Sequence, residues 1–163
     1  MTLLQFIRVL EGVVANQPAV NMIVRDSVLR VNDNPADRYG AFVWTQGQHS
    51  EGLSNDFRAF RFSLFYVDRL LQDQSNRTEI QSTGVEVLGN VIRTLGEDFD
   101  IVGEWSIETF TQRFTDECAG AWATVSFLVP VNTACPEHLT HYLRTSEGEI
   151  VADADERRVK VKI

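Results

Sequence analysis

The residues best suited to bind a metal lie in the last third of the chain. Cys135, His138 and His141 follow one another at three-residue spacing, and Cys118 precedes them. Thiolate and imidazole ligands suit zinc, so a Cys/His zinc site is one interpretation of this pattern. The alternative is a polar loop beside a buried thiol, because no second pair of ligands completes a zinc module. We predict no stoichiometric zinc, no other metal and no cofactor.

Other catalytic arrangements have weaker support. His49 and Ser50 are adjacent, but neighbouring residues rarely supply a nucleophile and its base together, and no nucleophile elbow precedes Ser50. Acidic pairs such as Asp98 and Asp100 fall in predicted turns, where solvated carboxylates are usual. We therefore expect that the chain is not an enzyme. A small metal-dependent enzyme built on the Cys/His residues stays open as an alternative, as does a monomeric partner-binding module.

Composition narrows the class of partner. The 163 residues are 44% hydrophobic and carry a net charge of −8, and the only lysines are Lys160 and Lys162. A chain of this length and hydrophobic content is expected to fold as one domain with a hydrophobic core. An acidic chain does not hold nucleic acid over a broad basic surface, although it can surround DNA without gripping it. No signal peptide or membrane-spanning run is seen, so we expect no membrane partner.

The first half of the chain predicts one helix followed by strands. Apolar residues at helical spacing, with Thr2 and Gln5 as a capping box, predict a helix over 2–15. β-Branched residues favour an extended segment over 20–31. Alternation in 57–70 places Phe60, Phe62, Leu64 and Tyr66 on one face of a strand. A short strand over 41–45 and a loop over 46–56 complete this half.

The second half predicts a helix and then a hairpin. Thr78 and Gln81 match a second capping box, and Gly96 is the expected end of that helix. Gly84 falls on the apolar face of the helix, where close packing on a sheet would explain it. Residues 110–130 predict a β-hairpin with an acidic turn ending in Gly120, for which we expect a positive φ.

These elements predict an α+β fold: an antiparallel sheet with a long hairpin, covered on one face by two helices. We expect the main domain to span 1–147. Residues 148–163 are expected to form a C-terminal arm or extra strand, because Val159 to Ile163 alternate between apolar and charged side chains. A terminal arm of this kind can become ordered on a neighbour.

With these residues assigned, the chain resembles phage tail-terminator and tail-completion proteins of the lambda type. The resemblance lies in the order of elements and in the turn Asp116-Glu-Cys-Ala-Gly-Ala-Trp122. It more closely resembles virion proteins of Bacteroidetes phages, including crAss-like ones. The matching features are Asp68-Arg69, Asn76, the hairpin residues 110–120 and Cys135-Pro136. The chain departs from that pattern at Tyr39-Gly40, where Tyr-Pro is expected, and in having Cys135 directly before Pro136.

The resemblance implies a tail-terminator-like structural protein, located in the virion and assembled in the cytoplasm of the host bacterium. It would form a homo-oligomeric ring at the neck or upper tail. Its expected partners are further copies of itself, other neck, tail or portal-side virion proteins, and DNA that passes through the ring without tight binding. The candidate interface residues are Asp116, Glu117, Trp122, Val159, Lys160, Val161, Lys162 and Ile163.

Overall fold

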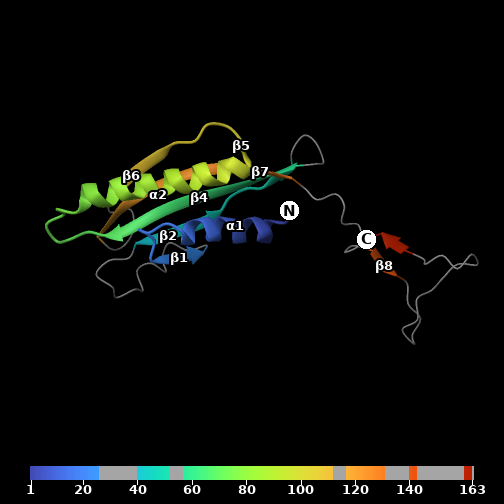
Figure 1. The fold of residues 1–163 in the computed structure, drawn as a ribbon, viewed down its shortest axis with the longest axis horizontal. Coiled ribbons are helices and arrows are strands. Elements are labelled where there is room, and N and C mark those ends of the chain that lie inside the picture. The colour runs from blue at the N-terminus through green and yellow to red at the C-terminus, as the bar shows by residue number, and fades with distance from the viewer. Residues whose placement is uncertain (26–39, 52–56, 112–116, 131–139, 143–159, 163) are drawn as a thin grey trace, which may run out of the picture. The chain divides into compact units, whose positions relative to one another are not determined.

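The computed structural model describes residues 1–25, 40–51, 57–111, 117–130, 140–142 and 160–162 (Figure 1). The chain divides into two parts, Met1–Val131 and Asn132–Ile163. The first part contains α1 (Leu3–Ala15), β1 (Met22–Arg25), β2 (Ala41–Gln46), β3 (Ser50–Glu51), β4 (Phe57–Arg69), α2 (Arg77–Asp98), β5 (Asp100–Ile101), β6 (Ile107–Thr111) and β7 (Cys118–Pro130). The second part contains β8 (Thr140–Tyr142) and β9 (Lys160–Lys162).

The two helices and the seven-stranded sheet of the first part confirm the predicted α+β class. The strand order is β1-β2-β4-β7-β5, with β3 paired to β4 and β6 paired to β7. Every pairing is antiparallel except that of β1 with β2, which is parallel. The predicted loop over 46–56 therefore contains the short strand β3, and the extended segment over 20–31 is described only as far as Arg25.

The long strands β4 and β7 form the centre of the sheet. They pair over their full length, from Phe57 opposite Pro130 to Arg69 opposite Cys118. The predicted hairpin is present as β6 and β7, paired from Ile107 opposite Ala123 to Thr111 opposite Ala119. Because β7 takes both β4 and β6 as neighbours, it is an interior strand of the sheet.

The expected positive φ at Gly120 is wrong. Gly120 lies inside β7, opposite Phe110 and Val67, and the described glycines with positive φ are Gly40 and Gly103. The reason for a glycine here is space, because a Cβ atom would clash directly with the backbone oxygen of Tyr66 on β4.

Helix α1 begins as predicted. The Thr2 hydroxyl accepts a hydrogen bond from the Gln5 amide at 3.2 Å, and the Gln5 side chain accepts one from the Thr2 amide at 2.8 Å. One turn later, Phe6 is completely buried at the centre of an aromatic cluster. Its ring lies 5.1–5.9 Å from the rings of Phe60, Phe62, Phe99 and Phe127. This cluster holds α1 against β4 and β7.

Helix α2 begins and ends differently from the prediction. Its N-cap is Asn76 and the second capping box at Thr78 is wrong, since the Gln81 side chain instead donates to the Phe110 carbonyl at 3.1 Å. The helix also continues through Gly96 to Asp98. Phe99 explains this extension, because it is buried against Phe6 and so prolongs the apolar side of α2 beyond Leu95.

In the second part, β8 and β9 form a two-stranded antiparallel sheet in which Thr140 pairs with Lys162 and Tyr142 with Lys160. The segment 148–163, expected to be a C-terminal arm or extra strand, contributes β9 to this pairing. The two compact parts of the chain meet after Val131, and the domain boundary expected after residue 147 stays a prediction.

Candidate assembly surface

Burial alternates along the strands and separates the two faces of the sheet. On β7, the side chains of Ala121, Ala123, Val125, Phe127 and Val129 are buried as predicted. They pack with α1, α2 and the even-numbered residues of β4 in the main core. Figure 1 shows α2 running along β4 and β7. No described helix covers the opposite face.

That opposite face is called the open face here and consists of partly or fully exposed side chains from three neighbouring strands. They are Thr45, Ala59, Arg61, Ser63, Trp122, Thr124, Ser126 and Leu128. At its centre, the hydroxyls of Ser63 and Thr124 lie 3.3 Å apart. Polar residues suit contact with water, whereas Trp122 and Leu128 leave apolar surface that a partner could bury.

Trp122 connects the open face to a small second cluster of apolar residues. This cluster comprises Val24, Ala41, Val43, Phe65, Val67, Phe110 and Cys118. The rings of Trp122 and Phe65 are stacked, with centroids 6.2 Å apart and planes 18° apart. One face of the indole is therefore supported by a buried ring, which fixes its orientation.

Beside Trp122 the surface forms a groove of about 310 Å³, called the tryptophan groove below. Its lining residues are Arg61, Glu104, Trp105, Ser106, Glu108, Trp122, Ala123 and Thr124. Glu108 on β6 is directly opposite Trp122 on β7 in the register. Trp105, which precedes β6, is 37% exposed. The groove thus combines two indoles, two carboxylates and one guanidinium.

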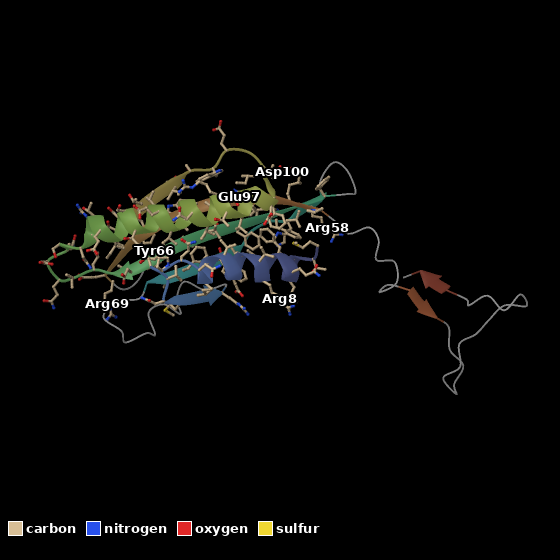
Figure 2. All side chains as sticks on the ribbon, in the orientation of Figure 1. Arg8, Arg58, Tyr66, Arg69, Glu97 and Asp100 are labelled. Atoms are coloured by element: carbon tan, nitrogen blue, oxygen red, sulfur yellow. The ribbon has the colours of Figure 1, made fainter. Side chains whose placement is uncertain are left out.

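The segment from the end of α2 through β6 makes the β5 and β6 side of the sheet strongly acidic. Residues 94–112 contain five acidic residues and no lysine or arginine. All five are exposed: Glu97, Asp98, Asp100, Glu104 and Glu108. Figure 2 labels Glu97 and Asp100, which lie where α2 passes into β5. Among the described residues, none of these five carboxylates forms an ion pair.

The Arg25–Glu11 pair lies beside a different hollow, of about 470 Å³, lined by Glu11 and by all of β1. Hydrogen bonds from Arg25 lower the pKa of the Glu11 carboxyl below its usual range, and burial partly opposes this effect. A further hydrogen bond from the Trp44 indole at 3.2 Å also lowers the pKa. This group ties α1 to β1 and β2, which is a structural role.

The other predicted interface residues are spread over the chain. Glu117 is exposed, its backbone oxygen accepts a hydrogen bond from Leu70 at 2.8 Å, and it does not line the tryptophan groove. Lys160, Val161 and Lys162 form β9. Asp116, Val159 and Ile163 lie outside the described residues. Among the predicted interface residues that the structure describes, only Trp122 lines the groove.

The sequence interpretation missed the groove residues Arg61, Glu104, Trp105 and Glu108. The predicted hairpin began at Phe110, too late in the chain to include Glu108. The position of Glu108 opposite Trp122 follows once β6 begins at Ile107. The local sequence pattern that could have indicated the groove is Trp105 between Glu104 and Glu108.

The proposed zinc ligands are only partly described. Cys135 and His138 lie outside the described residues, and His141 is in β8. Cys118 is buried in the second apolar cluster. The described residues contain no group of three or more His, Cys, Asp or Glu side chains that could hold a metal ion. The absence of zinc stays a prediction.

No protein family matches the chain, and no curated protein matches it significantly. None of the helices in the described part is long and apolar enough to cross a membrane. Fold, surface charge and the residues of the hairpin are the observations from which a function can be inferred.

Proposed function

We propose that this chain is a structural protein of a phage virion that assembles into a homo-oligomeric ring at the neck or upper tail, where it takes part in head–tail joining or tail completion. The observation that carries the assembly is the open face of the sheet. No described helix covers it, Trp122 and Leu128 leave apolar surface there, and the exposed Trp105 lines the tryptophan groove beside Trp122. Tryptophan is enriched in protein interfaces, and subunits that join through two different surfaces form a ring when the rotation from one to the next closes.

The virion assignment is supported by the resemblance of the hairpin residues and of the element order to tail-terminator and tail-completion proteins. The chain places a helix before the long strand β4, a second helix after it, and then the antiparallel pair β6 and β7. The sequence Asp116-Glu-Cys-Ala-Gly-Ala-Trp122, on which the resemblance rests, includes the first five residues of β7, Cys118 to Trp122.

The acidic charge fits a ring that surrounds DNA without holding it. Carboxylates facing a lumen repel phosphates, so the DNA exchanges no counterions for protein contacts and can move. The exposed acids at 97–100 and Glu117 are candidates for this surface. Neighbouring virion proteins on the neck, tail or portal side would bind the two ends of the ring.

Light scattering and electron microscopy of the purified chain test the assembly. We expect particles of one defined mass, several times the 18.5 kDa of the monomer, with a central opening. Ser63→Arg places a charged side chain in the middle of the open face and should abolish these particles. Val85→Arg, at an exposed apolar position on α2, is the matched control and should leave them intact.

A chain that stays monomeric at hundreds of micromolar would contradict the ring and favour the monomeric binding module. In phage particles that carry this protein, antibody labelling should lie at the junction of head and tail. Labelling at the capsid surface or the distal tail would contradict the neck position even if the purified chain forms rings.

A further inference from the structure

We propose that the tryptophan groove binds the basic C-terminal segment, residues 157–162, of a neighbouring copy of the chain. This inference rests on the proposed ring, for which it names the two surfaces that meet. The segment contains Arg157, Arg158, Lys160 and Lys162 without an acidic residue.

The groove has the chemistry that recognises a cationic side chain. Glu104 and Glu108 are exposed carboxylates in the groove lining, and neither is in an ion pair within the described residues. Trp105 and Trp122 line the same groove. An ammonium or guanidinium group is attracted to the face of an indole, and its hydrogen bonds to carboxylates are stronger than those between neutral groups.

The ring of Trp122 and the backbone of Glu108 are held in place before a ligand arrives. Trp122 is stacked on Phe65, which is buried. Glu108 lies within β6, opposite Trp122 in the register with β7. Preorganised groups lose little conformational freedom on binding, so more of the contact energy contributes to affinity.

The charge of the groove stays negative when its one cation is included. The groove lining contains one basic residue, Arg61, and two carboxylates, and segment 94–112 contains three further acids and no basic residue. A basic segment would therefore be attracted from a distance as well as at contact.

The occupant is suggested by the distribution of charge and by the small size of the second part of the chain. Lys160 and Lys162 are the only lysines of the chain, and both belong to β9. In the described residues β9 pairs with the three-residue strand β8 alone. A lone two-stranded sheet is marginally stable in water, so this part gains stability from a surface that binds it.

Charge reversal on each side tests the contact in the full chain. Glu104→Lys with Glu108→Lys reverses the groove, and Lys160→Glu with Lys162→Glu reverses the segment. We expect each double variant to weaken self-association at least about tenfold, because like charges then meet across the interface. An equal mixture of the two variants should recover association through the contacts in which the reversed groove meets the reversed segment. Gln72→Lys, Thr78→Lys and Glu86→Lys together change the net charge as much as the groove reversal does, at exposed sites in and just before α2 that lie outside the acidic segment, and this variant should behave as wild type.

Sedimentation velocity at several salt concentrations is the measurement. If both reversed variants assemble as wild type does, the groove contact is overturned while the ring itself stands. If reversal lowers the melting temperature but leaves association unchanged, the segment binds within its own chain and the neighbouring copy is excluded as occupant.

If the wild-type chain does not associate at all, the proposed ring fails independently of the groove. A synthetic peptide of residues 155–163, added to the Lys160→Glu, Lys162→Glu chain, then tests the groove by tryptophan fluorescence. Saturable binding that is lost on adding Glu104→Lys and Glu108→Lys to that chain would support the groove chemistry, and no binding would overturn it.

Discussion

Gly84 of α2 lies so close to Ala121 of β7 that a Cβ atom on Gly84 would come within 2.9 Å of the Ala121 Cβ atom. It would also lie 3.0 Å from the Ala121 backbone nitrogen and 3.2 Å from the ring of Tyr66. The expectation that Gly84 permits close packing on a sheet is confirmed. The contact fixes the distance of α2 from the two long strands, and hence the position of the strand that carries Trp122.

Gly84→Ala should therefore destabilise the protein although alanine is the better helix former. Alanine gains about 1 kcal/mol in helix propensity. Overpacking against a backbone atom costs about 1–3 kcal/mol, so we expect a net loss of unfolding free energy in urea titrations. Gly89→Ala is the matched control, since its Cβ atom would meet the Arg93 side chain at an ordinary 3.5 Å. A Gly84→Ala variant that gains stability like Gly89→Ala would contradict the close contact.

Gly120→Ala should be more damaging than Gly84→Ala. The added Cβ atom would clash with the Tyr66 backbone oxygen, and a paired backbone in the middle of a sheet cannot move without breaking its ladder. We expect a loss of more than about 3 kcal/mol, measured by urea denaturation, or failure to fold. The Phe110 ring would be the next atom group met, at 2.9 Å. Adding Phe110→Ala should not restore stability, and a full rescue would show that side-chain packing is the limiting contact.

Asn76→Ala should destabilise the chain where Thr78→Ala does not. The buried Asn76 side chain accepts a hydrogen bond from the Leu71 amide at 3.0 Å and donates one to the Arg69 carbonyl at 3.0 Å. Losing it leaves partly buried backbone groups without partners, at a cost of about 1–3 kcal/mol in thermal or urea unfolding. Thr78 lies inside α2 and is exposed, so its substitution should change the unfolding free energy by less than about 0.5 kcal/mol. If Thr78→Ala were the more destabilising of the two substitutions, Thr78 rather than Asn76 would be the N-cap.

Asn76 and Thr78 also show which features of the fold could be predicted from the sequence and which could not. Periodicity predicted the buried faces of α1, α2, β4 and β7, because one face of each element must be apolar to form the core. The cap of α2 was misjudged because Asn76 is used to bind a turn five residues upstream, a contact that no local pattern encodes. The tryptophan groove likewise depends on the register of β6 with β7 and on Arg61 from β4, which are distant in sequence.

Glu11 should stabilise the protein near neutral pH and lose that effect in acid. Its pKa is lowered in the folded state, chiefly by hydrogen bonds from Arg25, so its contribution is present above the pKa of the unfolded chain and is lost as the pH falls through the folded pKa. Arg25 is 65% exposed, so solvent screening limits the effect to less than about 1 kcal/mol. Urea titrations should show Glu11→Gln less stable than wild type at pH 7, with the gap closing as the pH falls through the folded pKa of Glu11. Glu86→Gln should show no gap, and a Glu11 gap that widens in acid would contradict the assignment.

Deleting residues 149–163 should separate folding from assembly. The deletion removes β9, whose described pairing is with β8, and both strands belong to the part of the chain that follows Val131. The two apolar clusters consist entirely of residues before that division, so the truncated chain should keep its cooperative unfolding transition in circular dichroism. Association should weaken, because the basic segment that the tryptophan groove would bind is gone. If the truncated chain forms the same ring, the segment does not hold neighbouring copies together. If it no longer unfolds cooperatively, the segment supports its own domain, and the division after Val131 does not mark an independent folding unit.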